Sequence, residues 1–165
     1  MTKAYKALPP ASELWEMFDY KPLTGDLVSK KSAGNAPAGT VRGGIEKHGY
    51  GIVSIQKSIF KRHRIIWMWV TGKDPGANLI DHINEKRADN RWGNLRLATR
   101  GQNVAHTSKT KGYERLGENS YRVCIKKDGK RYHYGPFKTE VEAAAAHKKA
   151  SLELHGEFSP YSETT

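Results

Sequence analysis

The sequence predicts an α+β protein made of two small domains. Short stretches of alternating apolar and polar residues, which are typical of half-buried strands, occur in both parts of the chain. Each part also contains a Thr followed three residues later by Gln or Glu, a signal that opens a helix. A polar, basic linker at residues 107–111 lies between the two parts. With 165 residues, 37% of them hydrophobic, the chain can bury two modest cores.

The composition limits the classes of function. The formal net charge is +11 and the pI is about 9.7, which favours a polyanionic partner over a merely basic surface. Cys124 is the single cysteine, so disulfides and zinc sites built from cysteine pairs are excluded. The longest run of large apolar residues, 65–70, is too short to span a membrane. No apolar segment follows residues 1–3, so we expect no signal peptide and an intracellular protein.

The N-terminal region predicts a short α/β extension. Pro9-Pro10 ends a loose arm, and Ser12 is the expected cap of a short helix with the apolar positions Leu14, Trp15 and Phe18. Residues 19–28 contain turn residues between two short extended pieces. Residues 30–44 show no periodic pattern. Three basic residues there could contact phosphate or simply cover the surface: Lys30, Lys31 and Arg42.

Residues 50–72 predict two strands and a helix. Residues 50–55 alternate as a strand, and residues 59–60 follow a turn as its partner. The basic residues 61–64 then lead into a helix that ends near residue 72 and packs its aromatic face inward. For His63 within this basic group, we favour packing or phosphate contact over catalysis.

Residues 79–106 predict a strand, a loop, a second strand and a helix. Leu79-Ile80 starts the first strand, and residues 95–97 alternate apolar and basic side chains as the second. Thr99 followed by Gln102 opens the helix. This order brings four polar residues within reach of one metal-sized site: Asp81, His82, Asn94 and Asn103.

The residue types at this site suit a hydrolytic metal centre. A hard divalent cation takes one or two oxygen ligands from a protein, which Asp81 and the amide of Asn103 would supply. His82 is neutral near pH 7 and can accept a proton from water if its ring is held, and Asn94 is the expected holder. We assign Asn90 to the stabilisation of a tight loop rather than to a ligand role.

This segment resembles the HNH endonucleases carried by bacteriophages and mobile introns, over residues 12–106. The matching strings are I-D-H-I-N at 80–84, D-N-R at 89–91, N-L-R at 94–96 and Q-N at 102–103, with a further pattern from Gly49 to Pro75. The resemblance implies a ββα-metal fold with His82 as general base and Asn94 as its orienting partner. It also implies Asp81 and Asn103 as ligands of a divalent ion, Mg²⁺ foremost and Mn²⁺ as the alternative.

Two positions depart from the family pattern. Many relatives carry Asn where this chain has His106, and Gly where it has Glu85. His106 is either an additional metal ligand or a solvent-facing helix residue, and both interpretations stay open. Arg96, on the second strand, either holds a phosphate by two parallel hydrogen bonds or is a plain surface residue.

The last fifty residues predict a three-stranded antiparallel sheet and one helix. Residues 121–126 alternate, with Tyr121, Val123 and Ile125 on one face. Asp128-Gly129 is a strong hairpin signal that leads into a partner strand at residues 131–134, and residues 112–116 provide the third strand. Thr139 and Glu142 open a helix that runs to about residue 154. Its expected packing face contains Val141, Ala143 to Ala146 and Leu152.

This C-terminal part resembles the APETALA (ethylene-response-factor) DNA-binding domain. The resemblance is carried by Gly112-Tyr113, residues 121–125, residues 135–137, residues 142–144 and residues 156–158. It implies that the exposed face of the sheet, rather than the helix, enters the major groove. Glu114 stands where the family often has Arg, and Cys124 replaces a polar contact, so the family's base preference does not carry over. The alternative is a basic domain that binds phosphate alone or only packs on the nuclease.

The sequence therefore predicts an HNH nuclease domain at residues 1–106 and an APETALA-like domain at 112–160. The function expected from the resemblance is metal-dependent hydrolysis of double-stranded DNA by a phage homing-type nuclease, in the cytoplasm of the infected bacterium. The alternatives are a non-catalytic DNA-binding regulator on an HNH scaffold and an RNA-binding module. We expect a monomer or weak dimer with no membrane and no cofactor besides the metal. The expected DNA contacts are Arg62, Arg64, Arg87, Arg91, Arg96, Arg115, Arg122, Lys126, Arg131 and His133.

Overall fold

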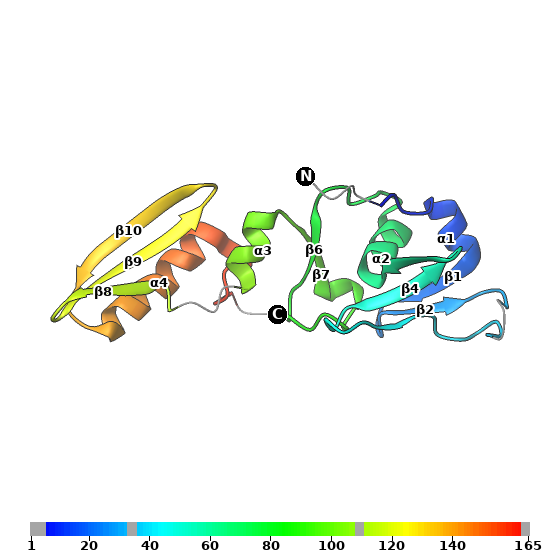
Figure 1. Ribbon diagram of the computed structural model, residues 1–165, viewed down its shortest axis with the longest axis horizontal. Helices are drawn as coiled ribbons and strands as arrows, with labels where there is room; N and C mark the ends of the chain where they lie inside the picture. Colours follow the sequence, from blue (N-terminus) through cyan, green and yellow to red (C-terminus); the bar gives the residue numbers. More distant parts are fainter. Residues whose placement is uncertain (1–5, 33–35, 108–110, 163–165) are drawn as a thin grey trace. The chain divides into compact units, whose positions relative to one another are not determined.

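The computed structural model describes residues 6–32, 36–107 and 111–162. The chain forms two compact units, Met1–Ala98 and Thr99–Thr165, and each combines antiparallel sheet with helix (Figure 1). The helix of residues 100–107, which the sequence analysis places in the nuclease domain, is thus grouped with the second unit. Within the described ranges, no helix has the length and apolar character needed to cross a membrane.

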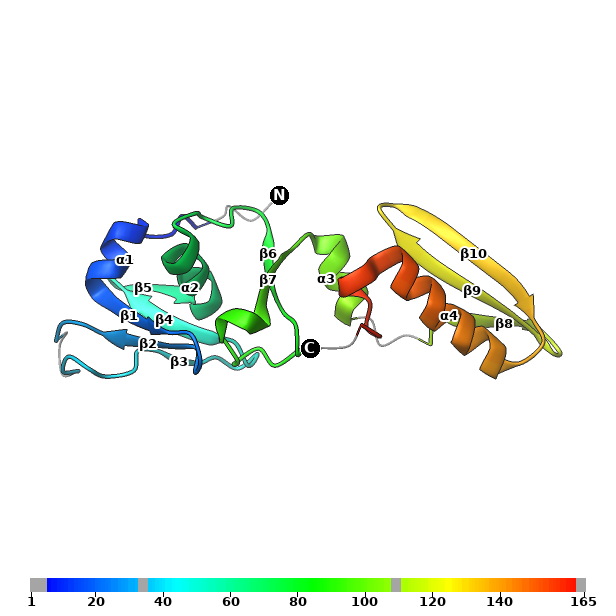
Figure 2. The same cartoon turned by 180° about the vertical axis from the view of Figure 1, so that it is seen from behind.

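The first unit contains three antiparallel sheets, of which one has three strands and the others have two strands each (Figure 2). β1 pairs with β2, β4 lies between β3 and β5, and β6 pairs with β7. The elements in chain order are α1 (Ala11–Met17), β1 (Phe18–Lys21), β2 (Asp26–Ser29), β3 (Gly44–Ile45), β4 (Gly51–Ile55), β5 (Ser58–Lys61), α2 (Arg62–Thr71), β6 (Leu79–His82), η1 (Trp92–Asn94) and β7 (Leu95–Ala98).

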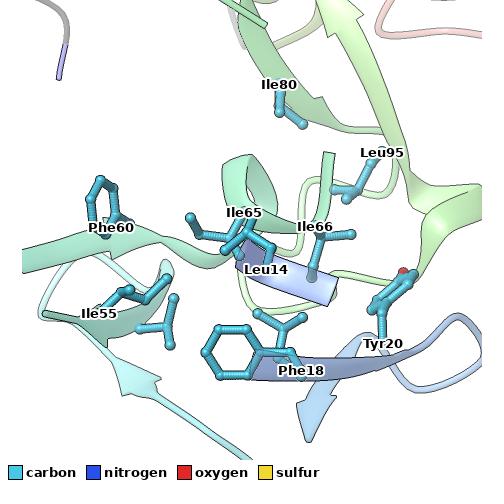
Figure 3. Close-up of a cluster of buried hydrophobic side chains, with 11 residues drawn as sticks. Leu14, Phe18, Tyr20, Ile55, Phe60, Ile65, Ile66, Ile80 and Leu95 are labelled. Carbon is cyan, nitrogen blue, oxygen red and sulfur yellow. The ribbon is translucent and has the colours of Figure 1, made fainter. Parts of the chain in front are cut away.

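Helix α2 lies at the centre of the first core. Ile65 and Ile66 of α2 are fully buried, and Figure 3 shows them among apolar side chains from α1, β1, β4 and β5. Ile80 of β6 and Leu95 of β7 belong to the same cluster. Each such buried side chain contributes about 1.5–3 kcal/mol of hydrophobic free energy. The core therefore fixes the β6–β7 hairpin against α2.

The predicted helix ends were right for α2 and wrong for α1. Gly72 ends α2 in the left-handed conformation, with φ of 69°, and its N–H donates to the carbonyl of Met68 at 2.9 Å. α1 begins one residue before the expected cap Ser12, so Ser12 lies in its first turn. Pro10 is the N-cap and supplies no side-chain hydrogen bond. A fixed proline φ places the chain for helix entry without a capping hydroxyl.

In the second unit, three strands form an antiparallel sheet in the order β10-β9-β8, as predicted. Asp128 and Gly129 both have positive φ, 49° and 81°, which is the signature of a two-residue type I′ hairpin turn. The elements are α3 (Arg100–Thr107), β8 (Tyr113–Gly117), β9 (Ser120–Lys127), β10 (Lys130–Phe137), α4 (Glu140–His155) and η2 (Gly156–Phe158).

Helix α4 covers one face of this sheet (Figure 1). Val123 and Ile125 of β9 are buried against Ala143 and Ala150, whose small side chains allow close approach. The capping box at the start of α4 is confirmed, because Thr139 Oγ1 accepts from the N–H of Glu142 at 3.2 Å.

The packing face of α4 differs from the predicted one. Val141 is 79% exposed and Leu152 is 36% exposed, so neither lies against the sheet. The buried positions besides the two alanines are His147 and Ser151. Polar residues are tolerated there because each is bonded, His147 Nδ1 to the Tyr161 hydroxyl at 3.0 Å and Ser151 to the Ser159 hydroxyl at 2.9 Å.

Candidate active site

The β6–β7 hairpin positions the two residues expected to carry the chemistry. Asp81 and His82 are the last residues of β6, and they pair with Arg96 and Leu95 of β7. Each is only 4% exposed, so both are held in a low-dielectric environment. A carboxylate next to an imidazole supplies an oxygen donor for a metal ion and a proton acceptor.

The His82 ring is held by Asn90. His82 Nε2 lies 3.2 Å from Asn90 Oδ1, and Asn90 Nδ2 donates to the carbonyl of Ala88 at 3.0 Å, which fixes the orientation of the amide. Because an amide oxygen only accepts, His82 Nε2 carries the proton and Nδ1 is the basic nitrogen. Burial lowers the pKa of His82, more than the Asn90 hydrogen bond raises it, so the ring is neutral at pH 7.

The N-terminal extension supports Asn90. The Tyr20 hydroxyl donates to the backbone carbonyl of Asn90 at 2.9 Å, and burial raises the pKa of Tyr20 to about 12, so it stays a donor. Gly25 and Gly51 leave the room that Asn90 needs. A Cβ on Gly25 would stand 2.5 Å from the Asn90 carbonyl carbon, and one on Gly51 would stand 3.0 Å from Asn90 Nδ2. Sequence reasoning missed Tyr20, which lies 70 residues from its partner.

The structure places Asn94 differently from our expectation. Its Oδ1 accepts from the N–H of Asn84 at 2.9 Å, and its Nδ2 donates to the carbonyl of Asp89 at 2.7 Å. Asn94 therefore ties together the loop between β6 and β7, and Asn90 takes the ring-holding contact instead. The loop that Asn94 closes is the one that carries Asn90, so Asn94 acts on His82 indirectly.

Asp81 forms an ion pair with Arg96. Arg96 donates through Nε at 3.0 Å and Nη2 at 2.8 Å to the same carboxylate oxygen, Oδ2, and the Arg96 side chain is 11% exposed. The interpretation of Arg96 as a plain surface residue is therefore wrong. The expected phosphate contact would have to use other N–H groups of Arg96 than the two that are bonded to Asp81.

The donor set fits a Mg²⁺-type ion. Among the described residues, no group of three or more His, Cys, Asp and Glu side chains could hold a metal. A metal at Asp81 therefore depends on one carboxylate together with amide, water and phosphate oxygens. Mg²⁺ is usually bound in this way, through one or two carboxylates and substrate phosphate.

Asn103 and His106 both lie on α3, in the second unit. Asn103 is half-buried, and His106 is 6% exposed, so the solvent-facing interpretation of His106 is wrong. The capping box that opens α3 is confirmed, because the N–H of Thr99 donates to Gln102 Oε1 at 2.8 Å and that of Gln102 to Thr99 Oγ1 at 3.2 Å. The ligand roles of Asn103 and His106 stay predictions.

An aromatic group packs around His82. The rings of His63 and His82 meet edge to face with centroids 5.2 Å apart, and Tyr50 contacts both rings. His63 is 6% exposed, and its Nδ1 has no hydrogen-bond partner among the described residues. Burial, with smaller effects from His82 and nearby cations, lowers the pKa of His63 to about 3. His63 thus packs as a neutral ring beside His82.

We expected several arginines of the first unit to contact DNA. These arginines occupy different environments. Arg64 bonds to the carbonyls of Gly76 and Asn78 and pairs with Asp74, so it braces the loop after α2. Arg91 pairs with Asp89 at 2.7 Å. Arg87 is exposed and lies 4.9 Å from the centre of the Tyr50 ring. Arg62 is half-buried at the start of α2.

In the second unit, the expected DNA contacts other than Arg115 lie on the sheet face opposite α4. Arg115 is paired with Tyr121, which packs on the α4 side. Lys126, Arg131 and His133 are exposed, whereas Arg122 pairs with Glu114 at 2.8 Å and Arg115 donates to the carbonyl of Gly117 at 3.1 Å. A recess of about 360 Å³ on this face is lined by Lys111, Gly112, Tyr113, Glu114, Arg122, Cys124, Arg131 and His133.

Because His63 is buried, we expect the stability of the protein to depend on pH. The pKa of His63 is about 3 in the folded protein and about 6.5 when unfolded, so below pH 6.5 the unfolded chain binds a proton that the folded protein does not. The free energy of unfolding should fall by about 2 kcal/mol between pH 6.5 and 5 from this group. Urea unfolding of the wild type and of His63→Phe at both pH values measures this difference. An identical pH dependence in the two proteins would rule it out.

Comparison with known proteins shows what this segment is similar to. Residues 60–105 match the HNH endonuclease family. An uncharacterized HNH endonuclease of Acanthamoeba polyphaga mimivirus is 34% identical over 116 residues, which cover 68% of this chain and 62% of the relative. The chain thus spans less than two thirds of the length of this relative. No solved structure is detectably similar. The segment that contains Asp81, His82 and Asn90 thus lies within the residues that match the HNH endonuclease family.

Proposed function

We propose that this protein is a metal-dependent DNA endonuclease in which His82 is the general base. The observation that carries the proposal is the neutral, oriented imidazole of His82, whose Nε2–H is bonded to Asn90 and which follows the buried Asp81 directly. The family match of residues 60–105 supports the same reaction.

His82 Nδ1 takes a proton from water, and the water oxygen attacks the phosphorus of the phosphodiester. The positive charge that forms on the ring is stabilised by Asn90 Oδ1, which already accepts the Nε2–H. The bond from phosphorus to the 3′ oxygen breaks, and this oxygen takes a proton from solvent, which leaves a 5′-phosphate and a 3′-hydroxyl. Asp81 would hold a divalent ion, Mg²⁺ or else Mn²⁺, whose charge would stabilise the phosphate and the leaving oxygen. The ligand role of Asn103 stays a prediction from the sequence.

The ion pair of Asp81 with Arg96 favours a second candidate, a DNA-binding regulator without nuclease activity. A carboxylate already neutralised by a guanidinium has less need of a metal. Nicking of supercoiled plasmid with Mg²⁺, and its absence with EDTA, separates the two functions. Competition between DNA and RNA tests the remaining alternative of an RNA-binding module.

Replacement of the base should remove cleavage and leave binding intact. His82→Ala should reduce the cleavage rate by about 10²–10⁴-fold, the usual contribution of a general base, because it removes the imidazole that takes the proton from water. DNA affinity in EDTA should stay at the wild-type value. His48→Ala is the matched control, since His48 is an exposed histidine of the same unit. A cleavage rate for the His82 variant equal to that of the control would refute the assignment.

Tyr20→Phe tests the support of the base from the N-terminal extension. The variant keeps the ring but removes the bond to the Asn90 carbonyl, which should cost about 1–3 kcal/mol of stability. It should also lower kcat while KM stays constant, because Asn90 then holds His82 less firmly. Tyr132→Phe, at a half-exposed tyrosine of the second unit, is the control. Loss of stability with an unchanged kcat would show that Tyr20 only supports the fold.

We further propose that the second unit binds DNA through the exposed face of its sheet, as an APETALA-type domain would. Arg131 of β10 lies directly opposite Lys126 of β9, and both are exposed. Like charges on opposite cross-strand positions destabilise a sheet by themselves. Such a pair is best accounted for by a polyanion that binds both residues.

The salt dependence of DNA binding tests whether Lys126 and Arg131 contact phosphate. Lys126→Ala with Arg131→Ala should flatten the slope of log affinity against log salt by roughly 1.8, about 0.9 for each lost contact. Lys148→Ala with Lys149→Ala removes the same charge from exposed positions of α4, which covers the other face of the sheet, and is the control. Equal slopes of log affinity against log salt for the two double variants would show that DNA does not bind through this face of the sheet.

A further inference from the structure

One acid lies on the basic face of the C-terminal sheet. Glu114 of β8 is directly opposite Arg122 of β9. Both side chains point away from α4, because the alternate residues Tyr113 and Val123 belong to the core between the sheet and α4. Of the described residues that line the recess on this face, Glu114 is the single acid, and it lies beside several basic residues. A carboxylate repels phosphate, so Glu114 would weaken a surface that only held the DNA backbone.

Glu114 and Arg122 form a pair that is only partly used within the protein. Nε and Nη2 of Arg122 both donate to the same carboxylate oxygen, Glu114 Oε1, and the bond from Nε is 2.8 Å long. Among the described residues, no group donates to Glu114 Oε2 and none accepts from Arg122 Nη1. The two side chains are 51% and 42% exposed, respectively. The pair therefore presents one hydrogen-bond acceptor and one donor, side by side, to an external partner.

The pair contributes little to the stability of the sheet. An exposed cross-strand ion pair stabilises a protein by about 0.2–1 kcal/mol. At the same time, the bonds to Glu114 neutralise Arg122, which would otherwise be available to phosphate. The pair thus lowers the affinity of this face for the DNA backbone. Its arrangement instead suits a partner that offers a donor and an acceptor together.

Base edges in the major groove offer this complementary pattern. Cytosine presents the N4 amino group as a donor, and its guanine partner presents O6 and N7 as acceptors. Carboxylates accept hydrogen bonds from cytosine N4, and arginine donates to guanine O6 and N7. A phosphate group offers acceptors alone, so it cannot bond to Glu114. The free oxygen of Glu114 and the free nitrogen of Arg122 together match a C·G base pair.

We propose that Glu114 and Arg122 recognise one C·G base pair, with Glu114 Oε2 on the cytosine amino group and Arg122 Nη1 on the guanine. This inference rests on the proposed binding of DNA through the sheet, and it adds that the sheet selects a sequence. Lys126 and Arg131 provide affinity for phosphate, whereas Glu114 provides discrimination between base pairs. A carboxylate that meets no donor weakens binding, so the pair acts chiefly against the wrong bases.

Selection of duplexes from a randomised library by the full chain, in EDTA, measures base preference without cleavage. The wild type should select C·G at one position, and any other pair there should weaken binding roughly 5- to 150-fold. Glu114→Ala should lose this preference, and its affinity for unrelated DNA should rise because a negative charge is removed. Glu118→Ala removes the same charge from the exposed β8–β9 turn and is the matched control, which should keep the preference.

Glu114→Gln gives a result that loss of folding cannot imitate. Glutamine bonds to N6 and N7 of adenine, so this variant should change the selected pair at the same position from C·G to A·T. A wild type without base preference, or a preference that Glu114→Ala retains, would overturn the proposal and leave DNA binding by the sheet intact. Binding that does not depend on Lys126 and Arg131 would reject the sheet as the DNA surface, and this inference with it.

Discussion

The hydrogen bond between Asn90 and His82 is the contact on which the site depends. Asn90 is 1% exposed, and all of its polar groups that face this site are used: Oδ1 for His82, Nδ2 for Ala88 and the carbonyl for Tyr20. Tyr20 belongs to β1, outside the segment that matches the HNH family. The N-terminal extension is therefore a structural part of the site. This explains why the β1–β2 turn has glycine at residue 25, where a side chain would collide with the Asn90 backbone.

Sequence patterns located several elements of both units well because local signals determine them. The alternation in β4, the glycine after α2 and the capping box of α3 are each contained in a few neighbouring residues. The choice between Asn90 and Asn94 as the partner of His82 has no such local signal. It depends on how the loop from Ile83 to Asn94 closes, and the closure includes a left-handed Glu85 with φ of 58°. Glycine adopts this conformation without strain, which accounts for Gly at this position in the family pattern.

The wrong prediction of the packing face of α4 also has a physical cause. Sequence reasoning placed large apolar residues of α4 on its buried face, but the buried positions are Ala143, His147, Ala150 and Ser151, and Val141 remains in solvent. The polar His147 occupies the interior instead, because Tyr161 satisfies its Nδ1. Gly112 permits this arrangement, since a Cβ there would stand 2.1 Å from His147 Nε2. Contacts of this kind join residues far apart in sequence and are invisible to a periodicity argument.

The excess of positive charge has two effects at the site. Cations around His82 and His63 attract a polyanion, and they also disfavour protonation of these rings, as Arg87 does for His82 and Lys61 and Arg64 do for His63. Burial lowers the pKa of His82 more than Arg87 does, so the ring of His82 in the free protein stays unprotonated chiefly because it is buried. When phosphates of a nucleic acid neutralise these cations, the same electrostatic relation acts in reverse and raises the pKa of His82. A ring with a higher pKa is a stronger proton acceptor, so substrate binding itself would increase the basicity of His82 at the moment when water must be deprotonated.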